Sequence, residues 1–219
     1  MENDGSPHKF FELTFILSEL VIIVAYVLVA EFNEDAHHPS TTSVTSADKN
    51  DLMQTYYTMW QHVHVMVFVG FGFLMVFLKT HCWTSVGFNF LIAAYAMQIT
   101  ILITSFWHDA LILGSFKYVP LDIPALVVGD FGAAAVLISF GALLGKCSIL
   151  QLWILATIEV IFYGLNEAVG AGILGAVDVG GSMYIHTFGA YFGLAASFFF
   201  KPKKAISDVE KRCSGGYNS

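Results

Sequence analysis

Ionisable side chains are rare in the long apolar stretches of this sequence, so each one needs a chemical reason. If the stretches cross a membrane, a charged group inside one costs about 2.5–3.5 kcal/mol on insertion scales. Such groups pair with one another, face water or line the path of a solute. They are Glu19, His62, His64, Asp130, Glu159, Glu167 and His186, with Asp178 just before the last stretch.

His186 is the strongest candidate for chemistry. It lies about one turn into an otherwise uncharged stretch, and Gly189, Ala190 and Gly193 continue its helical face. A row of small residues permits close helix packing and leaves a narrow passage beside the imidazole. A neutral imidazole can donate and accept a hydrogen bond, which suits a small polar solute. The alternative is a histidine that bonds across helices for packing alone.

Asp178 precedes Gly180-Gly181-Ser182 and the last apolar stretch. A carboxylate at this position can cap the following helix by accepting hydrogen bonds from its free backbone N–H groups. It can also favour a cation at the outer mouth of a pore. The two roles are compatible, and the cap is the simpler prediction.

Asp130 and Phe131 lie together in the outer third of the fourth apolar stretch. The carboxylate must pair or face water. A phenylalanine in a membrane helix usually faces lipid or packs against a neighbour, so its position alone gives little support to a role as a gate.

The fifth stretch carries Glu159 near its middle and Glu167, after Asn166, near its end. We expect this helix to turn both carboxylates toward polar partners, and structural pairing is the favoured account of Glu159. His64 is a candidate partner for one of the buried carboxylates, although its spacing does not indicate which one.

Apolar blocks of membrane-spanning length must position these residues. The chain has 219 residues, of which 56% are hydrophobic and 12% charged, whereas soluble domains carry about 25% charged residues. Each block has roughly the 17–25 residues that a spanning helix needs, and helices satisfy their own backbone in lipid. The sequence therefore predicts an all-α, polytopic membrane helix bundle with spans at 13–30, 60–78, 86–107, 123–144, 149–168 and 183–200.

Basic residues predict the orientation of these six spans. Eight of the ten Lys and Arg residues lie on the side that holds both chain ends, and the positive-inside rule makes that side cytoplasmic. We expect residues 1–200 to form one transmembrane domain with an outer loop at 31–57, followed by a cytoplasmic tail at 201–219. The sequence contains no phosphate-binding loop, dinucleotide fingerprint, zinc-type His/Cys spacing or Ser-His-Asp signature, so we expect neither an enzyme nor a cofactor, and no nucleic-acid partner.

Several motifs then resemble one known family. The segment around His186, Gly180-Gly-Ser-Met-Tyr-Ile-His-Thr-Phe-Gly-Ala-Tyr-Phe-Gly-Leu194, resembles the pore-helix motif of the Rh glycoproteins, the animal branch of the Amt/Mep/Rh ammonium transporters. Further matches, in the family's order, are His64-Val-Met66, Ser85-Val-Gly-Phe-Asn-Phe90, Gly129-Asp-Phe131, Gly141-Ala-Leu-Leu-Gly-Lys146 and Asn166-Glu167. The chain keeps the His-Thr-Phe-Gly pattern from which the erythroid Rh antigens depart, so it resembles the transporting branch.

The resemblance implies a homotrimer in the plasma membrane in which each subunit encloses its own hydrophobic pore. Ammonium is recruited at the outer mouth, loses its proton and crosses as ammonia. Carried over by position, His186 would be the first pore histidine and Phe131 the outer gate. Asp178 would order the mouth and aid deprotonation or cation binding.

The chain departs from the family pattern in two respects. His62 stands where the family usually has an acidic residue, two positions before His64. Family members are also considerably longer, and their two halves form an inverted repeat around the pore. The second pore histidine would belong to the later half, so we interpret this sequence as the first half, a truncated product or a fragment.

Two functions follow as hypotheses. The first is an Rh-type conductor of ammonium and ammonia. The second is a non-transporting subunit that assembles with full-length Rh proteins, as a hetero-oligomer, and alters their number or trafficking. Half-subunits that pair to rebuild a pore are a weaker third possibility, because the charge bias gives every copy the same orientation.

Overall fold

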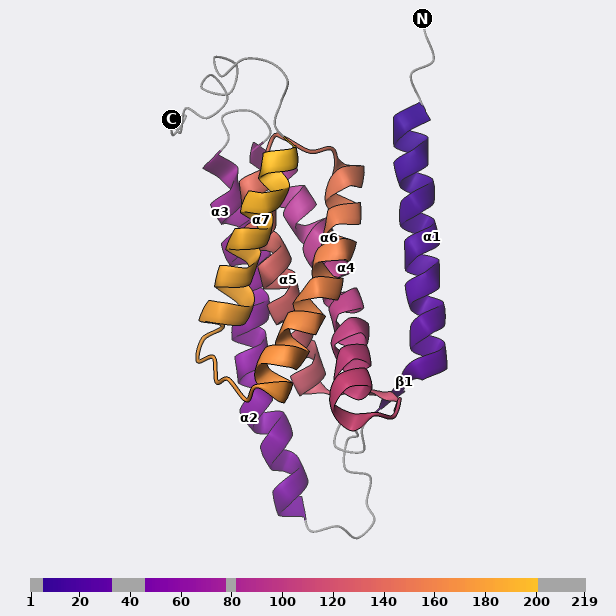
Figure 1. Cartoon of the computed structure of the whole chain (residues 1–219), viewed down its shortest axis with the longest axis vertical. Helices are drawn as coiled ribbons and strands as arrows, with labels where there is room; N and C mark the ends of the chain where they lie inside the picture. Colours follow the sequence, from indigo (N-terminus) through magenta and orange to yellow (C-terminus); the bar gives the residue numbers. More distant parts are fainter. Residues whose placement is uncertain (1–5, 33–45, 78–81, 201–219) are drawn as a thin grey trace, which may run out of the picture.

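Helical rods make up the described part of the chain. The computed structural model describes residues 6–32, 46–77 and 82–200, and within these residues the helices form six rods (Figure 1). The elements are α1 (Ser6–Val29), α2 (Ser46–Val65), η2 (Met66–Gly70), α3 (Phe71–Leu74), η3 (Met75–Phe77), α4 (Cys82–His108), η4 (Asp109–Leu113), α5 (Ile123–Leu143), α6 (Ile149–Glu167), η5 (Ala168–Ile173), η6 (Ser182–Thr187) and α7 (Phe188–Phe199).

The six rods confirm the predicted all-α helix bundle. The second rod runs from α2 to η3, the third joins α4 to η4, the fifth joins α6 to η5, and the sixth joins η6 to α7. By length and composition, four helices in the described residues can cross a membrane: Lys9–Val29, Trp83–Leu113, Ile123–Leu143 and Ile149–Ile173. α1 begins and α7 ends at the same end of the bundle (Figure 1). This arrangement agrees with an even number of membrane crossings.

Rod boundaries differ from the hydropathy prediction. The second rod begins at Ser46, so the predicted loop at 31–57 is wrong for residues 46–57, which are helical. The third and fifth rods continue to Leu113 and Ile173. A hydropathy profile detects only the apolar part of a helix, which lies in the hydrocarbon core of the membrane. The helix itself can extend further into water, because its backbone hydrogen bonds do not depend on the apolar surroundings. Residues 33–45 of the loop and the predicted tail at 201–219 lie outside the described residues.

α5 lies at the centre of the bundle because its residues are small. Its buried face includes Gly129, Gly132 and three consecutive alanines, Ala133, Ala134 and Ala135. A Cβ atom on Gly189 of α7 would lie 2.6 Å from the Ala135 carbonyl oxygen, and one on Gly193 would lie 2.7 Å from the Ser139 Cα. Gly189 and Gly193 thus allow the predicted close contact between α5 and α7, whereas Ala190 of the same row is exposed.

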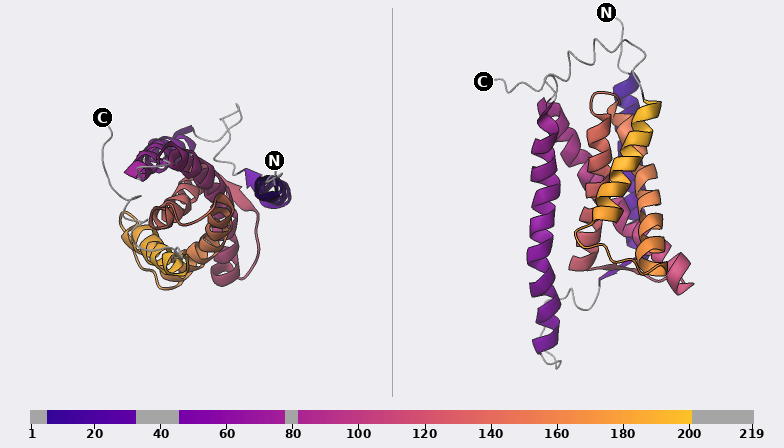
Figure 2. Two further views of the ribbon diagram at one scale, coloured as in Figure 1. Left: turned by 90° about the horizontal axis from the view of Figure 1, so that it is seen from above. Right: turned by 60° about the vertical axis from the view of Figure 1, so that its left-hand side comes forward.

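α1 stands at the side of the bundle (Figure 2). Several contacts hold it, and three of them involve Ser18, Tyr26 and Phe15. The Tyr26 hydroxyl donates to the Gln98 carbonyl oxygen at 2.8 Å, the Trp153 indole N–H donates to the Ser18 hydroxyl at 3.2 Å, and Phe15 packs edge-on against Trp153. Most of its large apolar side chains are exposed, as expected of a helix that meets lipid or another subunit.

A short pair of strands closes one end of the bundle. β1 (Ala30–Phe32) continues α1 and pairs in parallel with β2 (Val119–Leu121), with Ala30 opposite Val119. The hydropathy pattern does not predict these strands, because three residues are too few to show a period. The end that carries β1, β2, η4 and η5 is called the η4 end below (Figure 1).

Candidate functional site

Asp178 caps the start of the last rod. Its carboxylate accepts hydrogen bonds from the Ser182 hydroxyl at 2.7 Å and from the backbone N–H groups of Met183 and Tyr184 at 2.8 and 2.9 Å. Gly180 and Gly181 stand between at φ +83° and +69°, a conformation that favours glycine. The predicted cap is therefore confirmed, and the glycines let the chain turn back onto the carboxylate.

The same hydrogen bonds keep Asp178 charged. Partial desolvation acts to raise its pKa, but the hydrogen bonds from the Tyr184 N–H, the Ser182 hydroxyl and the Met183 N–H together outweigh it. The net effect lowers the pKa of Asp178 from its usual value. The lowered pKa favours a negative charge at neutral pH, and this charge lies at the positive end of the helix that begins with η6.

Within the part of the chain that the structure describes, one ring nitrogen of His186 makes a hydrogen bond and the other has no partner. Its Nδ1 lies 3.0 Å from the carbonyl oxygen of Gly181, within the π-turn of η6. A carbonyl oxygen can only accept, so Nδ1 carries the hydrogen and, in the neutral ring, Nε2 carries a lone pair. The side chain is exposed. His186 therefore presents a hydrogen-bond acceptor on an outward-facing part of a membrane helix.

Asp130 pairs with His64, which settles which carboxylate this histidine meets. His64 Nδ1 lies 3.0 and 3.3 Å from the two carboxylate oxygens of Asp130. Asp130 is fully buried, whereas the His64 side chain is 35% exposed. Rings of Trp60 and Phe68 flank the imidazole, with centroids 5.2 and 4.5 Å away. The pair ties α2 to α5.

Glu159 bonds to a hydroxyl group. Ser139 of α5 makes a short hydrogen bond to Glu159 Oε1, and the Ser139 hydroxyl also lies 2.8 Å from the Gly189 carbonyl oxygen of α7. Glu159 is 1% exposed, and its second carboxylate oxygen has no hydrogen-bond partner. The expected structural pairing thus exists, but it links three helices through a serine and includes no basic group.

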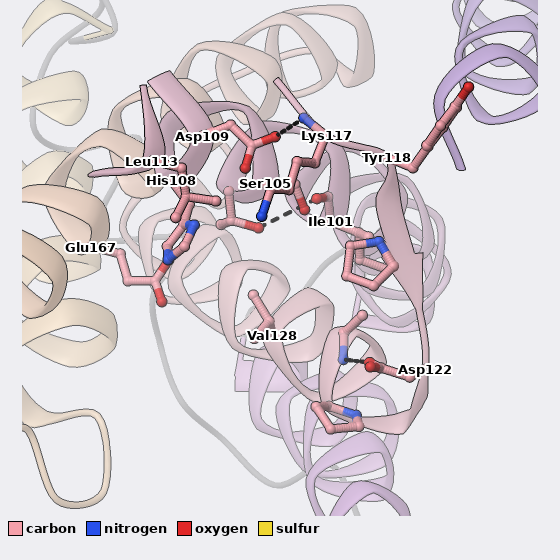
Figure 3. A pocket seen from close by; sticks show the side chains of 14 residues that line it. Ile101, Ser105, His108, Asp109, Leu113, Lys117, Tyr118, Asp122, Val128 and Glu167 are labelled. Carbon is pink, nitrogen blue, oxygen red and sulfur yellow. Dashed lines mark hydrogen bonds between the residues drawn. The ribbon is translucent and has the colours of Figure 1, made fainter. Parts of the chain in front are cut away.

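A pocket of about 450 Å³ opens at the η4 end. Glu167, from the end of α6, lines it together with His108, and the two side chains lie next to each other with Asp122 across the pocket (Figure 3). Asp109 and Asp122 also line the pocket, but the carboxylate of each already accepts a hydrogen bond from a backbone N–H group. Asp109 accepts from the Lys117 N–H at 2.7 Å, and Asp122 accepts from the Ala125 N–H at 2.8 Å. The carboxylate of Glu167 is the one best placed to meet a solute. Asn166 is exposed and does not line this pocket.

Sequence reasoning named Glu167 for this region but missed His108, Asp109 and Lys117. A signal existed: His108 and Asp109 directly follow the third predicted span, and Glu167 ends the fifth. Odd-numbered spans end on the same side of a membrane, so these groups could have been placed together. In residues 6–32, 46–77 and 82–200, no cluster of three His, Cys, Asp or Glu side chains is arranged to hold a metal ion.

The three predicted pathway residues occupy separate positions. Asp178 lies in the loop before η6 and His186 lies on η6, whereas Phe131 lies on α5, partly buried against the core. Among the described residues, no hydrogen bond or ring contact joins Phe131 to the other two.

Comparison with known proteins decides the family. A model described as the Ammonium Transporter Family matches residues 20–218. The chain belongs to the ammonium transporter family. It is 43% identical over 183 residues to ammonium transporter Rh type B of Danio rerio, covering 83% of this chain and 39% of that protein. With the Rh type B transporter of Pongo pygmaeus it shares 51% identity over 166 residues, 74% of this chain and 33% of that protein.

A solved structure in the same family shares the fold. The Nitrosomonas europaea Rh50 channel matches this chain with a TM-score of 0.55 and 27% identity, over 73% of this chain and 44% of that one. The chain spans less than half the length of the curated relatives it matches.

Family membership confirms several expectations about this Rh-type chain. It is a multi-pass membrane protein, its similarity is to the Rh branch, and its family is one of transporters and not of enzymes. The pathway roles of His186, Phe131 and Asp178 stay predictions.

Proposed function

We propose that this chain forms one wall of the conduction pathway of an Rh-type ammonium and ammonia channel. The observation that carries the proposal is His186, an exposed histidine on a membrane helix with its Nε2 free. A polar group on a membrane helix does not face lipid without a large cost, so it faces a solute path or another protein segment. An acceptor nitrogen is complementary to the N–H groups of ammonia and ammonium.

The proposed path has two stages: ammonium is attracted to the outer mouth by charge, and ammonia then crosses an apolar lumen. At the η4 end, the Asp178 carboxylate provides negative charge that attracts ammonium, and Glu167 lines a pocket at the same end. Stripping water from the cation in an apolar lumen costs several kcal/mol, whereas neutral ammonia loses only a few hydrogen bonds. At the mouth, ammonium gives one proton to water and the resulting ammonia enters the lumen, with Phe131 as the outer gate and His186 as the hydrogen-bonding group beyond it.

The proposal includes the cellular setting. Both termini of this chain lie in the cytoplasm, which places the η4 end outside, and the membrane is the plasma membrane. The exposed apolar side chains of α1 support a homotrimer or hetero-oligomer in which that face meets lipid or a neighbouring subunit.

Transport is tested in vesicles that contain the protein and an entrapped pH indicator. Ammonia that enters takes up a proton, so an inward ammonium gradient raises the internal pH at a rate set by permeability. We expect His186→Ala to slow this rate about five-fold, as loss of one hydrogen bond of about 1 kcal/mol implies. Val27→Ala, at an exposed apolar site on α1 and away from the sixth rod, is the control and should leave the rate unchanged. Wild-type vesicles no more permeable than empty lipid would refute conduction by this chain alone.

The same exposed face favours a second candidate function. Around His186 the sixth rod exposes Met183, Tyr191 and Leu194, a surface that a full-length Rh relative can cover. In this case the chain is a non-transporting subunit that changes the number or trafficking of its relatives. Co-expression with a full-length Rh type B protein, followed by affinity purification through a tag on this chain, tests it. Failure to recover the relative rules the subunit function out.

A further inference from the structure

The contact between α5, α6 and α7 holds three oxygen atoms in a row. The Ser139 hydroxyl oxygen lies in the middle, with Glu159 Oε1 on one side and the Gly189 carbonyl oxygen on the other. Each of the two contacts is at hydrogen-bonding distance and needs a hydrogen. All three groups are buried, so none of them can turn to solvent instead.

The number of hydrogen atoms available to these contacts indicates whether the Glu159 carboxyl group is protonated. A serine hydroxyl has one hydrogen, and a carbonyl oxygen has none to give. If Glu159 is ionised, the single hydroxyl hydrogen of Ser139 is the only hydrogen for both contacts. One pair of oxygen atoms, either Ser139 with Glu159 or Ser139 with Gly189, then lies at contact distance with no hydrogen between them. If Glu159 carries a proton on Oε1, it donates to the Ser139 oxygen, and Ser139 donates to the Gly189 carbonyl. We propose that Glu159 is a neutral carboxylic acid that positions the last rod through Ser139.

The surroundings of Glu159 agree with a neutral acid. A cavity of about 10 Å³ lies beside it, and the other lining residues are apolar: Ile92, Val136, Phe140, Leu143, Leu152, Leu155 and Ala156. None of them is a basic residue that could balance a negative charge. A water molecule needs several polar partners, and this cavity offers only Glu159. An ionised carboxylate with one oxygen unpartnered is far more expensive to bury than a neutral acid with the same oxygen unpartnered.

The proposed role concerns the register of the sixth rod. Gly189 follows His186 by three residues, and the absence of a side chain at Gly189 lets α7 approach the α5 backbone. The chain of hydrogen bonds from Glu159 through Ser139 to Gly189 then fixes how far α7 slides along α5. This inference does not depend on transport, because the proton and the contacts exist whether or not the chain conducts.

Infrared difference spectroscopy of the protein in membranes tests the protonation state directly. A protonated carboxylic acid has a carbonyl stretching band well separated from the bands of a carboxylate. We expect the wild-type protein at neutral pH to show such a band, and Glu159→Gln to remove it. Asp130→Asn is the matched control, because Asp130 is buried but paired with His64, and it must leave the Glu159 band in place. If Glu159→Gln instead removes carboxylate bands, Glu159 is ionised and the proposal is wrong.

Thermal unfolding in detergent tests the positioning role. A glutamine amide can donate to the Ser139 hydroxyl as the neutral acid does, so Glu159→Gln should unfold at the wild-type temperature. Glu159→Ala and Ser139→Ala should both unfold several degrees lower, and Ser139→Ala should add little once Glu159 is alanine. A Glu159→Gln protein as unstable as Glu159→Ala would overturn the proposal. If the alanine variants do not fold, the comparison of Glu159→Gln with wild type still decides the matter.

Discussion

Polar side chains inside the bundle and polar side chains on η6 are satisfied in different ways. Inside, Asp130 meets His64 from another rod, and Glu159 meets Ser139 from another rod. At the start of the sixth rod, Asp178 in the preceding loop accepts hydrogen bonds from η6 backbone N–H groups, and His186 on η6 bonds to the Gly181 carbonyl oxygen. The inner pairs therefore hold helices together, whereas the η6 pair shapes one helix end.

The difference separates residues for packing from residues for a solute. An inner carboxylate uses its hydrogen-bonding capacity on a neighbouring helix and is closed to solvent. His186 uses one ring nitrogen, Nδ1, for a hydrogen bond to the preceding turn, and its side chain is exposed. Removing an inner partner should thus affect the free energy of unfolding, and changes on η6 should act on local order or on a passing solute.

The largest expected effect comes from removing His64. His64→Leu leaves the Asp130 carboxyl buried without its partner, which should lower the free energy of unfolding by about 3 kcal/mol. His62→Leu is the matched control, because His62 is exposed on the same helix and should change stability little. Chemical unfolding in detergent micelles measures both. Equal stability of the two variants would show that the His64–Asp130 pair does not hold α2 to α5.

The α5–α7 contact should respond next. Gly193→Ala places a methyl group 2.7 Å from the Ser139 Cα, and overpacking of this kind costs about 1–3 kcal/mol. Gly87→Ala is the control. A Cβ there meets nothing within 4 Å, and alanine favours a helix by up to about 1 kcal/mol over glycine. The two variants should therefore shift the unfolding temperature in opposite directions, and a shared direction would contradict close packing as the role of Gly193.

Much of the fold follows from the sequence because membrane helices leave a local signal. Six apolar blocks with small residues near His186 predict six rods and a close contact for α7, since both depend on residue type within one segment. The cap by Asp178 is local as well, since Gly180 and Gly181 separate it from the helix it serves.

Contacts between distant segments could not be predicted in the same way. Asp130 and Glu159 both lacked an evident partner in the sequence, and only the arrangement of the rods selects His64 for one and Ser139 for the other. Ser139 gave no signal, because a serine in an apolar helix commonly bonds to its own backbone. The strand pair β1–β2 joins residues too far apart in the chain for any local pattern.

The smallest expected effect is local to the η6 cap. The pKa of Asp178 is lower in the folded protein than its usual value, which is about 3.9 for an unfolded chain. A group with a lowered folded pKa stabilises the fold above the unfolded pKa and loses this contribution as the pH falls through the folded pKa. Hydrogen exchange at the Met183 and Tyr184 amides should therefore be slow from neutral pH down to about pH 4, and protection should fall in stronger acid. Asp178→Ala removes the acceptor, so it should expose both amides at neutral pH and remove the acid dependence, whereas Asp122→Ala, at the cap of α5, should leave them protected. If the two amides are as well protected in Asp178→Ala as in the wild type, the carboxylate does not stabilise the start of the sixth rod, and the contrast between inner pairs and this cap would depend on His186 alone.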